Sequence, residues 1–296
     1  MRRHVKFSAL LLGLFMGLCS CTPREAQPIL TPYDIVENYP SEFSQFDIKT
    51  SYDSETAVRI KLSDGKITTS DSSLVTVNDN LVTIGGEGCY ILSGRLSNGR
   101  IIVSAEKTQK VHLVLDGAAI TSSDGPALYV ESADKTVLTL KNGSQNSFCD
   151  ALEYSDASMK GCIYSREDLT INGGGSLEVI SRYNNGISCR RDLRIVSGGI
   201  SISAVNNALK GNYSVAICGG KINILDCDDG IKADNDTKEG KGFVSIYGGE
   251  ISISARDDAI QAKNSVLVTG CRAVLSAEGK KVNCDGSLSL TEGCIF

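Results

Sequence analysis

The 296-residue chain contains no tryptophan and only two histidines. Without tryptophan it lacks the rows of broad aromatic faces that grip flat crystalline surfaces. His4 falls in an N-terminal targeting segment and His112 alternates within an expected strand, which excludes Ser-His-Asp catalysis and histidine-ligated zinc. Basic side chains are also few: 30 Lys and Arg face 35 Asp and Glu, and the formal net charge is −5. No basic stripe interrupts that balance, which argues against nucleic acid as a partner.

Cysteine is plentiful, but its spacing excludes metal–thiolate sites. None of the eleven cysteines forms a C-x-x-C pair. Cys271 and Cys294 stand 23 residues apart at one corner of the repeat described below, so as stacked neighbours they could form a disulfide. Buried thiols that fill core positions are the favoured interpretation, and the disulfide is the alternative.

A short phrase recurs along the second half of the chain. Its first two residues are Asn or Asp, the third is Gly or Ala, and the fourth is Ile or Leu. The copies lie 22, 22 and 29 residues apart, at Asn184-Asn185-Gly186-Ile187, Asn206-Asn207-Ala208-Leu209, Asp228-Asp229-Gly230-Ile231 and Asp257-Asp258-Ala259-Ile260. Glycine pairs recur at nearly the same spacing, 21 and 29 residues apart, at Gly198-Gly199, Gly219-Gly220 and Gly248-Gly249. A fixed period near 22 residues is typical of a solenoid.

Each repeat has the pattern of short strands rather than helices. Apolar and polar residues alternate in runs such as Ile200-Ser201-Ile202-Ser203. Three such strands and three turns fill about 22 residues, so one repeat should form one coil of a parallel β-helix with glycine at a corner. Inward residues should stack in ladders, one of them made of Ile187, Leu209, Ile231, Ile260 and Val282. The longer step reflects an insertion within 234–241, which should form an outer loop.

The N-terminus has the features of an export signal. Three basic residues precede an apolar segment over 7–18 that is too short to span a bilayer. The following Leu18-Cys19-Ser20-Cys21 resembles a bacterial lipobox, which implies removal of residues 1–20 and lipidation of Cys21. We therefore predict an exported lipoprotein of the cell envelope, at the outer membrane or cell surface, held there only by its lipid anchor. Residues 21–57, with four prolines, are expected to form a tether and N-terminal cap, and 58–296 the β-helix.

Several motifs in a fixed order resemble a known family. They are Ile91-Leu92-Ser93-Gly94-Arg95-Leu96, Val111-His112-Leu113-Val114-Leu115-Asp116-Gly117, Ser165-Arg166-Glu167-Asp168-Leu169-Thr170-Ile171-Asn172-Gly173 and the segment 228–236. Over about residues 58–280 the chain is similar to a bacterial carbohydrate-binding β-helix family, long catalogued as a domain of unknown function. The resemblance implies a right-handed parallel β-helix, shaped like calcium-dependent pectate lyases, that binds plant-type polysaccharide mainly without cleaving it. The chain departs from the family pattern at Asn206-Asn207, Ala208 and Ala259, which puts ion binding at those coils in question.

The acids of the repeat independently predict a calcium site. Two acidic pairs occupy the same turn on adjacent coils, so four carboxylates should lie close together and repel one another. Calcium takes six to eight oxygen ligands, and clustered carboxylates suit it. The expected ligands are Asp228, Asp229, Asp234, Asp236, Asp257 and Asp258. The alternative is that the acids cap backbone amides in tight turns, with Lys210 and Lys232 neutralising their charge.

Lys210 and Lys232 should stack on the outside of the solenoid, because each follows an inward ladder residue. Together with Tyr213 they are the expected carbohydrate-binding residues, and Tyr183 and Tyr247 are further candidates for stacking on single sugar rings. Either lysine is also the candidate base of a lyase, which would remove the proton α to a uronate carboxylate. That role needs a neutral amine, which neighbouring carboxylates disfavour, so a salt-bridge role is preferred.

Three hypotheses follow for the function. The preferred one is a surface-anchored, monomeric lipoprotein that binds polysaccharide, with acidic pectin-like glycans held through calcium. The second is a calcium-dependent polysaccharide lyase, and the third is a non-catalytic adhesin or structural solenoid. The preferred hypothesis assigns no catalytic residue.

Overall fold

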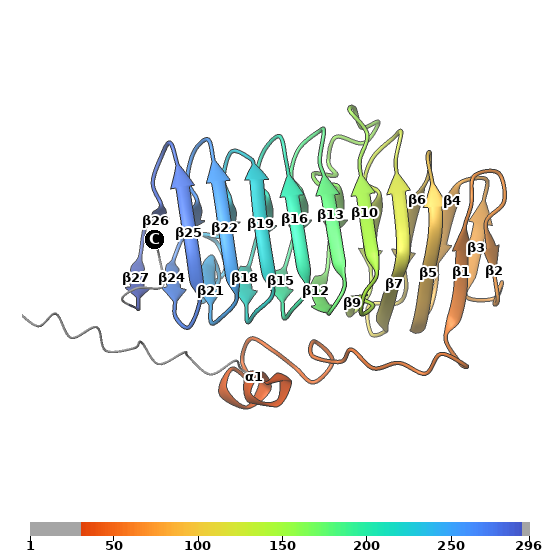
Figure 1. Ribbon diagram of the computed structural model, residues 1–296, viewed down its shortest axis with the longest axis horizontal. Coiled ribbons are helices and arrows are strands. Elements are labelled where there is room, and N and C mark those ends of the chain that lie inside the picture. Colours follow the sequence, from red (N-terminus) through yellow and green to blue (C-terminus); the bar gives the residue numbers. More distant parts are fainter. Residues whose placement is uncertain (1–30, 292–296) are drawn as a thin grey trace, which may run out of the picture.

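The computed structural model describes residues 31–291, which contain one helix and 27 strands. Strands of successive coils pair in parallel along three faces of an elongated solenoid (Figure 1). The predicted all-β parallel β-helix is thereby confirmed.

Each face is a stack of equivalent strands. The strap face, named for the N-terminal segment that covers it, contains β1 (Val58–Leu62), β5 (Gly88–Leu96), β7 (Lys110–Thr121), β9 (Lys135–Leu140), β12 (Asp168–Gly173), β15 (Asp192–Ile195), β18 (Ser214–Ile217), β21 (Phe243–Ile246), β24 (Ser265–Val268) and β27 (Ser287–Leu290). The serine face contains the ends of β5 and β7, then β10 (Gln145–Cys149), β13 (Ser176–Ile180), β16 (Gly199–Ser203), β19 (Lys221–Asp226), β22 (Glu250–Ala255) and β25 (Arg272–Ala277). The lysine face contains β4 (Leu81–Ile84), β6 (Arg100–Ser104), β8 (Leu128–Ser132), β11 (Ile163–Ser165), β14 (Ile187–Cys189), β17 (Leu209–Gly211), β20 (Ile231–Ala233), β23 (Ile260–Ala262) and β26 (Val282–Cys284).

The core consists of apolar ladders that run along the solenoid axis. On the lysine face Leu209 pairs with Ile231 and Ile231 with Ile260, as the spacing of the repeat predicts. On the serine face Ile202 pairs with Ile224 and Ile224 with Ile253. All these side chains are buried, and burying each contributes about 1.5–3 kcal/mol. The register of one coil is therefore fixed by its neighbours.

The glycine pairs mark the corner between the strap face and the serine face. Gly220 adopts φ 94°, a backbone conformation that favours glycine. A Cβ atom there would also lie 2.7 Å from the carbonyl oxygen of Gly198 on the preceding coil. Both constraints require glycine at this corner, which explains why it recurs with the period of the coils.

Residues 31–57, here called the strap, lie along one side of the solenoid rather than across its end, and residues 21–30 of the expected tether and cap lie outside the described part of the chain. They begin with helix α1 (Pro32–Asn38), which has a capping box between Thr31 and Asp34, and then run along the outside of the strap face to β1 (Figure 1). Near the helix the Tyr39 ring stacks on Tyr247 at 3.7 Å between centroids. A composition rich in proline suggested a tether, but it does not exclude an extended segment that packs on a sheet.

Buried polar contacts hold the centre of the strap. The Asp47 carboxylate is fully buried, and the Lys135 ammonium donates to both of its oxygens at 2.7 and 2.8 Å. Thr170 donates to the same carboxylate, and the Asn172 amide donates to the Asp47 carbonyl at 2.8 Å. Burial raises the pKa of Asp47, but the charges of Lys135 and Arg194 and the hydrogen bonds from Lys135 and Ser44 outweigh it, so the pKa lies below its usual value.

The two ends of the solenoid are finished differently. At the first coils β2 (Thr68–Thr69) pairs antiparallel with β1, and β3 (Val75–Asn78) pairs antiparallel with β4. At the other end β27 leaves Leu288 and Leu290 exposed. Within residues 31–291 no helix is long and apolar enough to cross a membrane. The signal segment and Cys21 lie outside the described residues, so export and lipidation stay predictions.

Several cysteines are buried within the solenoid, among them Cys162, Cys189 and Cys227. Burial raises the pKa of Cys189 to about 12, which is typical of a thiol that packs as a small apolar group. Cys271 is buried at its corner, and Cys294 lies outside the described residues, so the disulfide between them stays the untested alternative to buried thiols.

Candidate functional site: an acidic turn beside a lysine row

The recurring phrase forms the turn that leads into strands of the lysine face. Its second residue is buried in every copy: Asn185, Asn207, Asp229 and Asp258 expose between 2% and 4% of their surface. Its first residue is more exposed, as at Asp257. The two positions of the phrase therefore have different roles, which the sequence pattern does not distinguish.

The buried position forms a polar ladder between coils. Asp229 Oδ1 accepts the backbone N–H of Asp258 at 3.1 Å, and Asp258 Oδ1 accepts that of Lys280 at 2.8 Å. Asn185 Oδ1 likewise accepts the N–H of Asn207 at 3.2 Å. These bonds satisfy backbone groups that would otherwise be buried without a partner. This is the amide-capping alternative that the sequence left open.

The ladder is interrupted beside the acids. Asn207 occupies the equivalent position one coil before Asp229, and its Oδ1 atom is buried without a hydrogen-bond partner among residues 31–291. Its amide nitrogen is satisfied, since it donates to Asn185 Oδ1 at 2.7 Å. One oxygen next to the acidic turn is therefore left as an unused acceptor.

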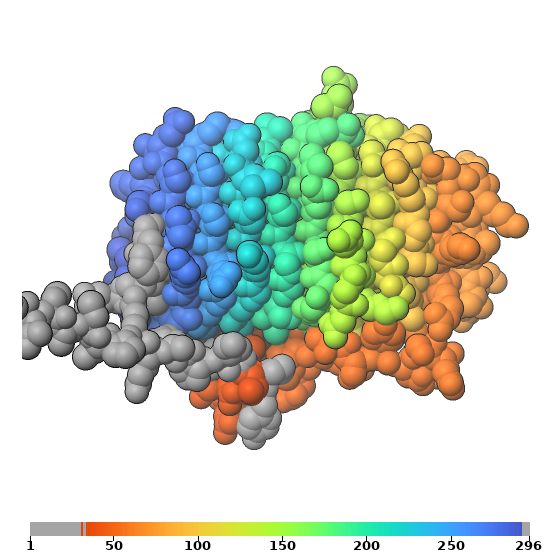
Figure 2. All heavy atoms as spheres, viewed as in Figure 1, coloured from red at the N-terminus to blue at the C-terminus, as the bar shows by residue number. Residues whose placement is uncertain are grey.

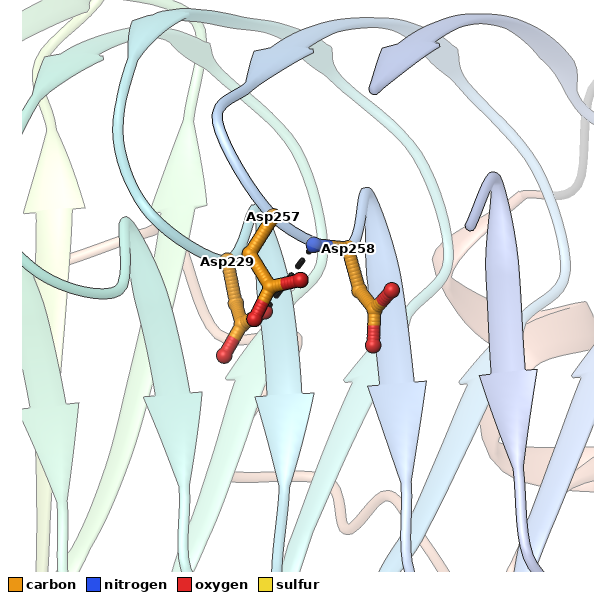
Figure 3. Close-up of side chains that lie close together, drawn as sticks. All are labelled: Asp229, Asp257 and Asp258. Carbon is orange, nitrogen blue, oxygen red and sulfur yellow. Dashed lines mark hydrogen bonds between the residues drawn. The ribbon is translucent and has the colours of Figure 1, made fainter. Parts of the chain in front are cut away.

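Three carboxylates converge at this turn. Oxygen atoms of Asp229, Asp257 and Asp258 all lie within 4.8 Å of one another (Figure 3). Asp229 and Asp258 are buried, and Asp257 lies above them at the surface. The convergence follows from the 29-residue step, which places the two acidic pairs on adjacent coils.

The charges of the three carboxylates are only partly balanced. Lys232 donates to Asp229 at 2.7 Å. Burial raises the pKa of Asp258, but hydrogen bonds from the Lys280 N–H, Asn283 and Gln261 outweigh it and lower the pKa. Within the described chain neither Asp257 nor Asp258 forms a salt bridge, and the carboxylates of Asp258 and Asp229 raise the pKa of Asp257. The turn therefore carries uncompensated negative charge.

The other three expected ligands do not join this group, which corrects the expectation of one six-acid site. Asp228 is on the same turn, but Arg256 binds its carboxylate at 3.0 Å. Asp234 follows the far end of β20 and pairs with Lys210 at 2.6 Å, and Asp236 lies in the loop beyond it. Strand β20 stands between Asp229 and Asp234, because three extended residues separate the two turns.

Lys210 and Lys232 are neighbours in the pairing of β17 with β20, so they stack as predicted. They belong to a longer outward row on the lysine face that continues through Tyr129, Tyr164, Ser188, Gln261 and Asn283. Both lysines are ion-paired with aspartates, the arrangement expected of the salt-bridge role. A lyase would have to break such a pair before either amine could accept a proton.

The tyrosines proposed to stack on sugars are engaged by protein groups. Lys238 and Lys241 of the insertion lie over the Tyr213 ring, at 4.5 and 5.4 Å from its centroid. Tyr247 is covered by Tyr39 of the strap. Tyr183 stacks on Tyr154 at 4.1 Å. These contacts give each ring a structural role in the conformation described.

Two aromatic members of the outward row were missed from the sequence. Tyr129 and Tyr164 face each other across β8 and β11, with ring centroids 5.8 Å apart. They stand 35 residues apart, because the loop between β10 and β11 lengthens that coil. Because this interval is longer than the 22-residue period, a search for residues at that period does not pair the two tyrosines. The alternation of apolar residues around Tyr129, in Leu128-Tyr129-Val130, still indicates that Tyr129 points outward.

The acidic turn fits the chemistry of a hard divalent cation. Calcium–oxygen distances of about 2.3–2.6 Å place two ligand oxygens at most about 5 Å apart, and the three carboxylates meet that condition. Asp229, Asp257 and Asp258 are therefore the residues that could hold such an ion.

Comparison with known proteins agrees with the fold and the class of ligand. The family model described as "Carbohydrate-binding domain-containing protein" matches residues 78–293, so the chain belongs to this carbohydrate-binding family. A relative of that description from Acetivibrio thermocellus is 40% identical over 213 residues, 70% of this chain and 74% of the relative. A solved structure, described as a gadolinium derivative of the polysaccharide lyase-like protein from C. thermocellum, matches with a TM-score of 0.79. It is 39% identical and covers 81% of this chain and 99% of its own.

Proposed function

We propose that this protein binds acidic polysaccharide on its lysine face, with calcium bound at the acidic turn, and that a lipid on Cys21 anchors it to the cell envelope. The observation that carries the proposal is the convergence of Asp229, Asp257 and Asp258 at the edge of the lysine row. The family supplies the general class of ligand, and the charges of this face suggest its acidic character.

The unbalanced carboxylates support a bound cation. The carboxylates of Asp258 and Asp229 repel the deprotonated Asp257 carboxylate, and no cationic side chain of the described chain forms a salt bridge with it. When bound, calcium would supply positive charge and open coordination positions that suit a uronate carboxylate.

The lysine row supports an extended polymeric ligand. Lys210, Lys232 and Gln261 occupy adjacent coils, so their side chains repeat at about 4.8 Å along the solenoid. Each lysine keeps donors beyond the one used in its ion pair, because an ammonium group has three. A glycan lying along the axis would therefore meet one polar side chain per coil.

A single-charge substitution at the turn tests the proposal. Asp257→Asn should lower calcium affinity at least about tenfold, which corresponds to about 1.4 kcal/mol. Calorimetry with calcium and luminescence of bound terbium measure this, and binding to polygalacturonate should weaken in parallel. Because Asp257 is exposed, strand content should not change.

The matched control is Asp236→Asn, which removes the same charge beyond the other end of β20 and should leave both affinities unchanged. An excess of chelator should reduce polygalacturonate binding by the wild-type protein to the level of Asp257→Asn. Full calcium affinity in Asp257→Asn would refute the metal site. Glycan binding that is insensitive to both the variant and the chelator would refute its role in recognition.

A further inference from the structure

The serine face carries a hollow that the proposed function does not use. It has a volume of about 580 Å³, within the range of small-ligand sites, and is lined by residues of β10, β13, β16 and β19. One row across these strands is Ser147, Glu178, Ser201 and Asn223, each paired in register with the next. A second row is Gln145, Ser176, Gly199 and Lys221. This face is turned toward the viewer in Figure 2, with the strap confined to its lower edge.

The hollow is deepened by a glycine that the fold does not need. Gly199 does not have positive φ, unlike its neighbour Gly198 at φ 109°. A Cβ atom at Gly199 would meet Gly175 and Ser176 at 3.7 Å, an ordinary van der Waals distance. A larger side chain would therefore be accommodated by the backbone and would project into the hollow.

Three polar side chains of the hollow have no protein partner among residues 31–291, whereas Asn146 and Ser176 are hydrogen-bonded and Lys221 lies 3.8 Å from the Glu250 carboxylate. In the part of the chain described, the side chains of Ser147, Ser201 and Asn223 make no hydrogen bond to another protein group. The other two faces differ. Polar residues of the strap face bind the strap, as Thr170 and Asn172 do, and the central lysines of the lysine face are ion-paired. Unused donors and acceptors in a concave site suit a ligand rich in hydroxyl groups.

The hollow is balanced in charge. Its lining holds one acid, Glu178, and one base, Lys221. Partly exposed Ile180 and Leu225 belong to the same two strands as these residues and add apolar surface beside the rows. A site without net charge gives no electrostatic preference for uronates, whereas apolar contacts and hydroxyl-binding groups suit neutral sugar rings.

We propose that this hollow is a second binding site that takes a neutral, extended oligosaccharide of about three sugar residues lying along the solenoid axis. Its four strands are separated by three steps of about 4.8 Å, so the site is about 14 Å long. Neighbouring coils contribute equivalent side chains, which matches a ligand made of repeated units. The site lies on a different face from the acidic turn and does not rest on calcium.

Filling the hollow tests the proposal. Gly199→Gln and, separately, Ser201→Gln should each weaken binding of a neutral β-linked tetrasaccharide at least about tenfold. Cellotetraose, xylotetraose and mannotetraose are the probes, measured by calorimetry on the full-length protein. Ser276→Gln places the same side chain at an exposed position of β25 on the same face, and it should bind as wild type.

Tetragalacturonate and calcium separate this site from the proposed function. Both Gly199→Gln and Ser201→Gln should bind tetragalacturonate and calcium as tightly as wild type. Asp257→Asn should bind tetragalacturonate and calcium more weakly but keep wild-type affinity for the neutral tetrasaccharides. Binding of at least one neutral tetrasaccharide by the wild type, lost in both filled variants, supports the second site. The proposal is overturned if the wild type binds none of the three, or if both filled variants bind them as tightly as Ser276→Gln.

Discussion

One buried ion pair holds the centre of the strap, and Asp47→Ala tests its contribution. The Asp47 carboxylate accepts hydrogen bonds from the Ser44 N–H at 2.8 Å, the Ser44 hydroxyl at 2.6 Å and the Lys135 ammonium at 2.7 Å. The Lys135 side chain is only 12% exposed. The substitution would leave that ammonium under the strap without a counter-charge.

The expected cost follows from this burial. Removing one partner of a buried ion pair destabilises by about 3–5 kcal/mol, because the remaining charge stays desolvated. Thr170 also loses its acceptor. The loss falls on the strap rather than on the ladders of the core, so the expected result is local release of the strap. A loss of 3 kcal/mol raises the open population on the order of a hundredfold.

Proteolysis at Lys49 measures strap opening directly. Lys49 lies in the strap, and trypsin cleavage under native conditions tracks the open population when closing is fast. Asp47→Ala should therefore be cut about a hundred times faster than wild type, while far-ultraviolet dichroism of the β-helix stays unchanged. Asp53→Ala, an exposed acid of the same strap, is the matched control and should change opening by no more than about 0.5 kcal/mol.

A second substitution distinguishes lost charge pairing from lost packing. The double variant Asp47→Ala with Lys135→Met removes both charges and should recover much of the resistance to trypsin. Replacing a buried ion pair with apolar residues often leaves stability unchanged. Equal cleavage rates for the single and double variants would refute the stranded-charge reasoning. So would wild-type protection in Asp47→Ala.

The pH dependence of strap protection has a definite sign. The pKa of Asp47 in the folded protein lies below its ordinary value of 3.8, so its contribution is present above that value. The contribution is lost as the pH falls through the lower folded-state pKa. Wild-type protection should therefore decline only in strong acid, and Asp47→Ala should lack that decline.

Two further predictions concern the core and the anchor. Ile231→Ala should destabilise by about 2–5 kcal/mol in urea unfolding, because Ile231 is fully buried, whereas Ile180→Ala, at a position 39% exposed, should cost no more than about 1 kcal/mol; similar costs would contradict the ladder. Cys21→Ser should release the protein from the membrane fraction of the producing bacterium or leave it unprocessed; a variant that still sediments with membranes at the mature size would show that the lipid prediction is wrong.

Much of the fold could be predicted because a solenoid makes its long-range contacts periodic. The spacing of 22 residues between Ile187 and Leu209 is also the length of one coil, so a local count predicts which side chains stack. The same reasoning brought Asp229 and Asp258 together and stacked Lys210 on Lys232. In such a fold, position within the repeat is equivalent to position in space.

Contacts that do not follow the period were decided only by tertiary structure. The strap carries no repeat, and Asp47 meets Lys135 and Thr170, partners 88 and 123 residues away. Which carboxylates converge was likewise decided by tertiary structure: Arg256 binds Asp228, and strand β20 separates Asp234 from the turn, which leaves Asp229, Asp257 and Asp258 together.

The hollow depends on a further property that the sequence does not display. Ser147, Gly199 and Ser201 are ordinary small residues in the sequence, and only the alignment of the four strands β10, β13, β16 and β19 makes a depression. The period of the repeat thus settles which residues stack. Which side-chain donors, acceptors and charges stay without a protein partner is settled by packing, because the partners come from coils and segments that share no spacing.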